Sequence, residues 1–385
     1  MPQQDLQPVP MLDLSREFAL IRDEVMAAIE AVCTSQRFIL GPEVPSFEQS
    51  AATFCEVPFA SGWASGTDAL WLALAALQIG PTHSVLTTPF SFFATASSIL
   101  RAGATPLFAD IDPLTFNLSP ESAAETISAN PNSNIAAIMP VHLYGQCADM
   151  TALSALATQH NLRIVEDAAQ AFGSRWNNTP AGALGDAAAF SFYPTKNLSA
   201  FGDAGLVTTS DSEIDARIKM LRAHGMRTRY FHDELGWNSR LDTLQAAVLS
   251  VKLRRVPAAN QRRREIAALY DAAFIAAGLT AASTSEGIVL PYTDPRAEPI
   301  FHQYVIRAPR RDALRAHLTA HKIGSEIYYP LPLHQQKALA PLGYKTGDFP
   351  HAERAAAEVL ALPIYPELRA DEIATVVEAI RRFYA

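Results

Sequence analysis

Residues 191–198 have the sequence Ser-Phe-Tyr-Pro-Thr-Lys-Asn-Leu and follow an apolar run at 187–190. That run is typical of a buried strand, and Pro194 ends it because proline has no N–H to donate to a neighbouring strand. Lys196 then stands on the turn just beyond the strand. It is the first of six lysines in a chain with twenty-five arginines. An amine that must lose its proton and bond a carbonyl can only be lysine, whereas a surface cation can be either residue type. Lys196 is therefore either a Schiff-base lysine or a surface lysine near a turn.

Before this stretch, short apolar runs alternate with helical segments. We expect strands at 84–88, 105–110, 135–141, 162–166 and 187–190, with helices at 92–102, 120–129 and 150–160 between them. The alternation predicts right-handed βαβ units and an α/β fold with a mostly parallel sheet covered by helices. Ligands of such sheets bind beyond the carboxyl ends of the strands, so the motifs at those ends are candidate site residues.

Three motifs accompany the lysine. Residues 65–68, Ser-Gly-Thr-Asp, precede a strong helix former at 69–77, where free backbone N–H groups suit a phosphate; a plain N-cap is the alternative. Aromatic residues at 90–93 follow an expected strand. Asp167 ends another expected strand, and a carboxylate that is buried there needs a cation or hydrogen-bond donors. A helix cap would explain Asp167, and so would the protonated ring nitrogen of a pyridoxal cofactor.

The rest of the chain is mainly helical at first and then mixed. We expect a strand at 206–209, helices at 214–223 and 241–253, a break at Pro257 and a helix at 262–277. Strands at 288–290 and 302–307, a helix at 311–321, and two last helices at 351–361 and 371–384 follow. An amphipathic helix covers 14–32. This pattern predicts a large domain at 1–256, including the N-terminal helix, and a smaller C-terminal α+β domain at 257–385.

Composition narrows the function classes. The chain has 385 residues, 49% hydrophobic and 18% charged, and a net charge of −8, which argues against a general nucleic-acid binder. Three widely spaced cysteines suggest neither a disulfide framework nor a metal site, and no histidine spacing suits zinc. Dinucleotide, P-loop and nucleophile-elbow motifs are absent from the sequence. With no signal peptide and no membrane span in view, we expect a cytoplasmic protein.

Taken in order, the helix start, aromatic, aspartate and lysine resemble the fold-type I pyridoxal-phosphate enzymes. Among these, the chain is similar to the DegT/DnrJ/EryC1/StrS family of sugar-nucleotide aminotransferases. The resemblance runs over nearly the whole chain and is carried by residues 9–14, 41–43, 65–70, 165–170, 191–205, 238–247 and 328–330. Two small departures are Ser199, where a glycine is frequent, and Ala64, where a second hydroxyl is frequent.

The resemblance implies a role for each matching residue. Lys196 would carry the cofactor, pyridoxal 5'-phosphate (PLP, or pyridoxamine 5'-phosphate), as an aldimine and move the proton, and Asp167 would pair with the pyridinium nitrogen. The other implied cofactor contacts are Gln170 to the ring hydroxyl, Phe92 on the ring face (with Phe90 and Phe93 as alternatives), Gly66, Thr67 and Ser191 to the phosphate, and Asn238 to the phosphate of the neighbouring subunit in a homodimer with shared active sites.

The implied reaction is a ping-pong transamination that moves an amino group from L-glutamate to a nucleotide-linked keto sugar. The motifs at 191–194 and 328–330 favour a 3-keto hexose linked to dTDP or UDP. Candidate substrate contacts are Arg240, Tyr328, Tyr329 and His334. Two alternatives remain: a PLP-dependent dehydratase or cofactor-retaining regulator of the same fold, and a non-catalytic nucleotide-sugar-binding relative.

Overall fold

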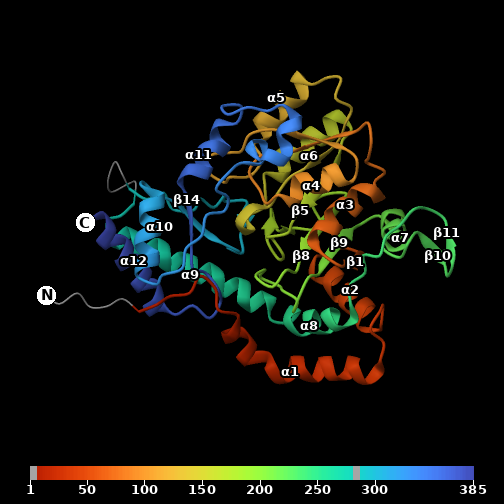
Figure 1. The fold of residues 1–385 in the computed structure, drawn as a ribbon, viewed down its shortest axis with the longest axis horizontal. Helices are drawn as coiled ribbons and strands as arrows, with labels where there is room; N and C mark the ends of the chain where they lie inside the picture. The colour runs from red at the N-terminus through yellow and green to blue at the C-terminus, as the bar shows by residue number, and fades with distance from the viewer. Residues whose placement is uncertain (1–6, 281–286) are drawn as a thin grey trace.

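The computed structural model describes residues 7–280 and 287–385. Within them, a seven-stranded sheet forms the centre of the large domain, in the order β1-β9-β8-β5-β4-β2-β3 (Figure 1). Its strands are Phe59–Trp63 (β1), Ser84–Thr87 (β2), Thr105–Phe108 (β3), Ile135–Met139 (β4), Arg163–Asp167 (β5), Ala187–Ser191 (β8) and Gly205–Thr209 (β9). Strands β3, β2, β4, β5 and β8 are mutually parallel, and β9 alone runs antiparallel to both of its neighbours. The predicted α/β fold with a mostly parallel sheet is confirmed.

Helices cover both faces of this sheet, because neighbouring residues along each strand point to opposite sides. Val85 packs with helices α3 (Gly66–Ala76), α4 (Ala94–Arg101) and α7 (Ser212–Leu221). The next residue, Leu86, packs on the other face with α2 (Glu43–Phe54), α5 (Pro120–Ala129), α6 (Met150–His160) and α8 (Thr243–Leu253). Helix α1 (Leu14–Ser35) lies along α8 at the edge of the domain (Figure 1).

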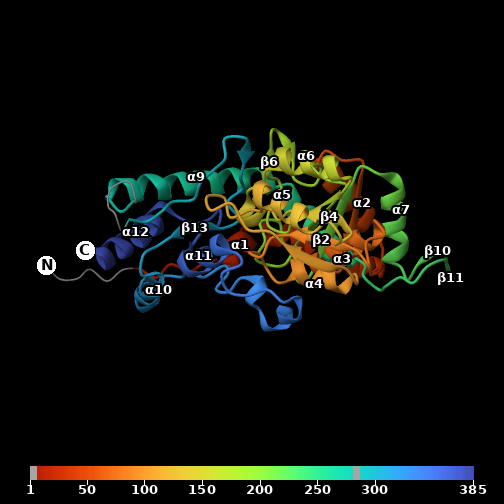
Figure 2. The same ribbon diagram turned by 90° about the horizontal axis from the view of Figure 1, so that it is seen from above.

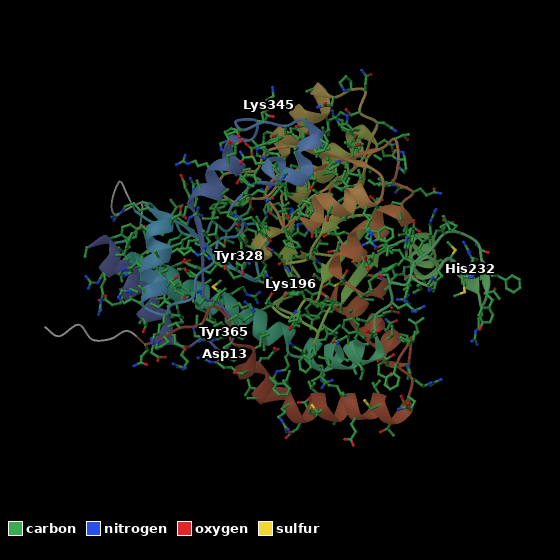
Figure 3. The ribbon with its side chains drawn as sticks, in the orientation of Figure 1. Asp13, Lys196, His232, Tyr328, Lys345 and Tyr365 are labelled. Carbon is green, nitrogen blue, oxygen red and sulfur yellow. The ribbon has the colours of Figure 1, made fainter. Side chains whose placement is uncertain are left out.

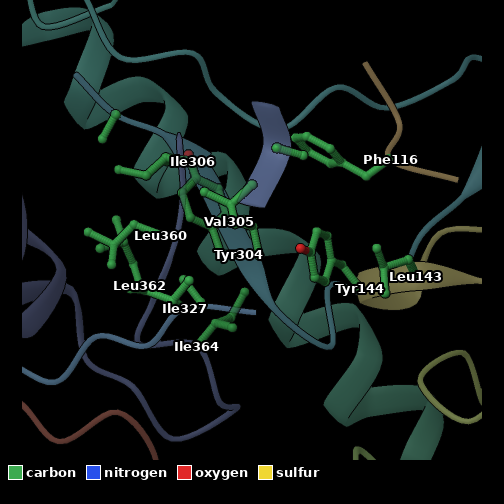
Figure 4. Close-up of a cluster of buried hydrophobic side chains, with 14 of the residues drawn as sticks. Phe116, Leu143, Tyr144, Tyr304, Val305, Ile306, Ile327, Leu360, Leu362 and Ile364 are labelled. Carbon is green, nitrogen blue, oxygen red and sulfur yellow. The ribbon is translucent and has the colours of Figure 1, made fainter. Parts of the chain in front are cut away.

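The C-terminal part packs as a second layered unit beside the sheet. The antiparallel pair β13 (Tyr304–Arg307) and β14 (Val359–Leu362) packs with α9 (Val256–Ala276), α10 (Arg311–Ala320), α11 (Pro350–Glu358) and α12 (Ala370–Tyr384). The core of this unit continues into the large domain through Phe116, Leu143 and Tyr144 (Figure 4). Helix α9 runs along the molecule and contributes Val256 to one core and Phe274 to the other (Figure 2). The sheet is thereby held against the C-terminal unit.

Minor elements complete the described chain. They are β6 (Arg175–Trp176), β7 (Thr179–Pro180), β10 (Met226–Thr228), β11 (Phe231–His232), β12 (Ala297–Glu298), and the 3-10 turns at Leu143–Gly145, Leu333–Gln335 and Lys337–Leu342. The hairpin β10–β11 projects from the end of the large domain (Figures 1 and 2). In the described part of the chain, no helix combines the length and apolar character needed to cross a membrane.

Several sequence predictions of secondary structure were wrong. The expected strand at 288–290 consists only of isolated bridges at Ile288 and Val289. The helix expected at 351–361 stops at Glu358, because the chain then enters β14, an apolar run that a helical pattern also fits. Pro257 does not break the chain: it lies in the first turn of α9, where its missing N–H costs nothing. The domain division at 256/257 stays a proposal.

Candidate active site

A cavity of about 750 Å³ lies where the carboxyl edge of the sheet meets the C-terminal unit. It collects residues from seven segments of the chain: the βαβ topology brings 65–70, 91–94, 141, 167–170 and 191–203 to one edge of the sheet, and the C-terminal unit adds 302–303 and 326–329. Figure 3 places Lys196 near the middle of the molecule, with Tyr328 on the C-terminal side of it. The predicted site residues that line the cavity are Gly66, Thr67, Phe92, Asp167, Gln170, Ser191, Lys196, Tyr328 and Tyr329.

Lys196 and Asp167 form the electrostatic centre of the cavity. Lys196 stands on the turn after β8, closed by its N–H donating to the Tyr193 carbonyl at 2.8 Å. Burial lowers the pKa of its amine to about 8, although the charge of Asp167 raises it. Asp167 is buried at the end of β5, and burial raises the pKa of its carboxyl against a hydrogen bond from Thr95 Oγ1 at 2.7 Å. An amine that loses its proton easily and a buried carboxylate thus face the same space.

The first turn of α3 forms an anion-binding wall opposite Ser191. Ser65 caps the helix by accepting the Asp68 N–H at 3.1 Å, and the N–H groups of Gly66 and Thr67 have no acceptor inside the helix. Gly66 is required by close packing, since a Cβ there would lie 2.5 Å from Ser191 Cβ. The helix start and the end of β8 therefore lie in contact on one side of the cavity, where free N–H groups and the Ser191 hydroxyl suit a phosphate.

The three candidate aromatic residues occupy different places. Phe92 lines the cavity and is 59% exposed, whereas Phe90 is fully buried in the core and Phe93 packs against the C-terminal cluster. The ring of Phe92 lies 6.2 Å from that of Tyr329. An exposed aromatic face at this point suits a flat ring, so among these residues the geometry favours Phe92 as the stacking residue.

Gln170 is buried and fixed by its neighbours. Its Oε1 accepts the Tyr144 N–H at 2.7 Å, and its Nε2 donates to the Tyr329 hydroxyl at 3.1 Å. The Tyr144 hydroxyl in turn donates to the Tyr328 carbonyl. These contacts join the sheet edge to the Tyr328–Tyr329 segment and define how far the two walls of the cavity stand apart.

Three predicted residues do not line this cavity. Asn238 is exposed on the loop after β11, and Arg240 follows it with an Nε that is buried and without a partner in the described chain. The adjacent Ser239 anchors the loop by donating to Asp68 Oδ2 at 2.7 Å. His334 is buried elsewhere, with its Nε2 3.0 Å from Glu353 Oε1. A single chain thus does not bring Asn238, Arg240 or His334 to Lys196.

The structure adds cavity residues that sequence reasoning missed: His302, Gln303 and Glu326. His302 and Gln303 were assigned only to a strand, yet both precede β13, and both keep a buried polar atom without a partner in the described chain. The available signal was a His-Gln pair beside an apolar strand, which is weak without tertiary contacts.

Glu166, the neighbour of Asp167, has a structural role on the other side of β5. His142 Nδ1 accepts the Ala148 N–H at 3.1 Å, so its Nε2 carries the proton and donates to Glu166 at 2.9 Å. Glu166 also accepts hydrogen bonds from the backbone amides of Gly182, Leu184 and Gly185. A buried carboxylate with all these donors is satisfied and holds the loop behind Asp167 in place.

The fold and this site define a class, the fold-type I PLP-dependent aminotransferases. Residues 19–381 match the model of the DegT/DnrJ/EryC1/StrS aminotransferase family, and the chain belongs to that family. This confirms the predicted resemblance, cofactor and enzyme class. The alternative of a non-catalytic nucleotide-sugar-binding relative loses its basis, because the family is one of aminotransferases and relatives of this chain are named as nucleotide-sugar transaminases.

Individual relatives carry a regulatory name in one case and aminotransferase chemistry in others. The chain is 46% identical to a "Pleiotropic regulatory protein" of Geobacillus stearothermophilus, with 98% of each chain covered. It is 41% identical to a "UDP-N-acetyl-3-dehydro-alpha-D-glucosamine 3-aminotranferase" of Acidithiobacillus ferrooxidans, with 97% of each covered. A crystal structure of DesV from S. venezuelae in complex with a ketimine intermediate matches with a TM-score of 0.92 and 42% identity, covering 98% of each chain.

Proposed function

We propose that this protein transfers the amino group of L-glutamate to the C3 carbonyl of a keto hexose linked to UDP or dTDP, working as a cytoplasmic homodimer. The observation that carries the proposal is the cavity itself, in which Lys196, Asp167 and the anion-binding start of α3 share one space. The 3-keto preference is supported by a relative whose name specifies a 3-dehydro sugar and a UDP carrier.

The residues fit PLP chemically. Gly66 lets the start of α3 pack directly against Ser191, where any Cβ would collide, and the α3 N-terminus supplies free N–H groups for a phosphate. Asp167 is a buried carboxylate that lines the same cavity, which suits a protonated pyridine nitrogen. When bound, the cofactor supplies an electron sink for the bond that is broken at the amino-bearing carbon.

The chain's own residues then position and move protons. The lowered pKa of Lys196, about 8, leaves a useful fraction of neutral amine near neutral pH to accept a proton from one carbon and return it to another. Asp167 stays charged when a cationic nitrogen lies beside it, since an opposite charge offsets the burial that raises its pKa. Thr95 and the Ala169 N–H orient the carboxylate.

Asn238 and Arg240 support the dimer in this proposal. Neither lines the cavity of its own chain, and the loop that carries them follows the projecting β10–β11 hairpin. We assign Asn238 to the cofactor phosphate and Arg240 to the nucleotide diphosphate of the partner's cavity. His334 is bonded to Glu353 below the cavity, so its role as a substrate contact remains only a prediction.

The test is to incubate the holoenzyme with L-glutamate and a panel of 3-keto and 4-keto nucleotide sugars. We expect an aminated sugar and one equivalent of 2-oxoglutarate, with the highest kcat/KM for a 3-keto sugar. Lys196→Ala should bind cofactor without forming a borohydride-reducible link and should lose at least about a thousandfold in rate, as expected for loss of a nucleophile. If glutamate converts the cofactor but no sugar is aminated, the proposal fails, and the dehydratase or regulator alternative gains support.

A further inference from the structure

The C-terminal unit lines one wall of the cavity with hydrogen-bond acceptors and a carboxylate, whereas the sheet edge carries Lys196 and Asp167. We propose that this wall selects a neutral, hydroxyl-bearing sugar ring and rejects a uronate, with His302, Gln303 and Glu326 as the specificity-determining residues. The inference rests on the proposed function and deepens it, because it concerns the class of sugar that this site accepts.

His302 and Gln303 offer hydrogen-bonding atoms that the protein leaves unused. Both side chains are 8% exposed and both line the cavity. His302 Nδ1 and Gln303 Oε1 are buried without a partner in the described chain. Buried polar groups are almost always hydrogen-bonded, and leaving one unpaired costs roughly 1–3 kcal/mol. Two such atoms side by side at a substrate cavity indicate groups kept for a ligand.

The chemistry of these atoms points to a hydroxyl-bearing ligand. Gln303 Oε1 can only accept a hydrogen bond. Burial and the charges of Lys196 and Arg263 hold the pKa of His302 well below its usual range, so its ring is neutral and keeps one accepting nitrogen. A hydroxyl can donate to such acceptors, whereas a carboxylate, which only accepts, would leave Gln303 Oε1 unpaired.

Glu326 adds a negative charge to the same wall. Its Oε1 accepts from the Ile327 N–H at 2.9 Å and from Arg315 at 2.8 Å, and its side chain is 43% exposed. Arg315 partly offsets the charge, but it does not line the cavity, while Glu326 does. Burial and, after it, the charge of Glu326 raise the pKa of the Tyr328 hydroxyl, so this charge acts inside the cavity.

The charges around the cavity therefore disfavour a second anion on the sugar ring. Among the described residues that line it, the charged side chains are Asp167, Lys196, Asp203 and Glu326, and none is an arginine. Lys196 is committed to the reaction, and Arg240 from a partner is assigned to the diphosphate. Any carboxylate on the sugar ring would therefore enter a cavity that offers it the charge of Glu326 and no arginine, and like charges in a partly buried site repel strongly.

The experiment uses two substrates that differ only at C6: UDP-N-acetyl-3-dehydro-glucosamine and the corresponding UDP-linked 3-dehydro-glucuronate. For wild-type holoenzyme we expect kcat/KM for the neutral sugar to exceed that for the uronate by at least about fiftyfold. Glu326→Gln keeps the shape and removes the charge, so it should raise kcat/KM for the uronate by about tenfold relative to that for the neutral sugar. Glu298→Gln, a similar change outside the cavity, should leave the ratio as it is.

Gln303→Met tests the unpaired acceptor. Because the proposal assigns this atom to the sugar, the substitution should raise KM for the neutral sugar by about tenfold and affect the half-reaction with glutamate much less. That half-reaction also shows that the variant is folded. Equal use of both sugars by the wild type, an unchanged ratio in Glu326→Gln, or equal losses in both half-reactions of Gln303→Met would each overturn the inference while leaving the aminotransferase function standing. If neither sugar is aminated, the proposed function itself fails.

Discussion

Burial and the partner's charge shift the pKa values of Lys196 and Asp167 in opposite directions. Burial disfavours the ammonium form of Lys196 and lowers its pKa to about 8, while the negative charge of Asp167 favours that form and raises the pKa. Only the neutral amine can attack a carbonyl. The state of the site before cofactor is bound therefore depends on pH close to neutrality.

We predict that cofactor-free protein attaches PLP faster as the pH rises from about 7 to about 9, with a midpoint near the pKa of about 8. The direction follows because the reactive neutral amine is populated above its pKa. In Asp167→Asn the midpoint should move to lower pH, since the charge that raised the pKa of Lys196 is gone. Stopped-flow visible absorbance measures the rate. A midpoint near that of free lysine, or no movement in Asp167→Asn, would contradict this account, and Asp203→Asn serves as a control for a more distant charge.

The residues of the reacting centre could be predicted from the sequence because each stands beside an apolar run. Asp167 ends one such run and Lys196 follows another, so their common edge follows from the βαβ rule. His302 and Gln303 gave no comparable signal: their significance lies in atoms that the folded chain leaves unpaired. His334 shows the reverse, because a histidine in a polar loop proves to be buried against Glu353 and Phe349.

At the scale of elements, the site depends on how closely α3 approaches β8. Gly66 opens the helix, and a Cβ on it would lie 2.5 Å from Ser191 Cβ and 2.9 Å from Ser191 Cα. Since the obstructing atoms include backbone, a side chain here requires one element to move. The anion-binding wall would widen with that movement.

Gly66→Ala should therefore weaken PLP binding by about tenfold to a hundredfold and lower the free energy of unfolding by about 1–3 kcal/mol, the usual cost of overpacking. Gly202→Ala is the matched control: its Cβ would meet only the flexible end of Gln245 at 3.2 Å, and we expect little change. Cofactor titration by fluorescence and thermal unfolding of the cofactor-free protein measure the two effects. Unchanged cofactor affinity in Gly66→Ala would show that α3 does not hold the phosphate.

Elements were predictable where the pattern was unambiguous. Strands β2 to β5 and the helices between them follow from alternating apolar and amphipathic runs, which tertiary contacts only trim at the ends. β14 was misread because Val-Leu-Ala-Leu continues the helical pattern of α11, and only pairing with β13 decides for a strand. Strand β1 and helix α2 were not predicted, since their position at the sheet edge depends on contacts with β9 and α8.

At the scale of the whole molecule, the loop that carries Asn238 and Arg240 lies outside the cavity of its own chain. The β10–β11 hairpin projects into solvent and exposes Tyr230 and Phe231, and Leu235 beyond it is 89% exposed (Figure 1). Asn238 follows on the same segment, outside the cavity of its own chain. Apolar side chains exposed together are typical of a surface that a second copy covers, and a two-fold dimer would give each cavity one such loop.

Mixing two inactive variants tests this arrangement. In a dimer of Lys196→Ala with Asn238→Glu, one site combines both defects and the other combines the intact Lys196 of one chain with the intact Asn238 of its partner. After unfolding and refolding an equal mixture, half of the dimers are mixed and half of their sites are intact, so about a quarter of wild-type activity should return.

Lys196→Ala mixed with Asp167→Asn is the control and should recover nothing, because those residues belong to the same half of the site. Asn238→Glu alone should lose cofactor affinity, since its carboxylate repels the phosphate. If the first mixture stays as inactive as its components, Asn238 acts within its own chain, and the shared active site must be abandoned.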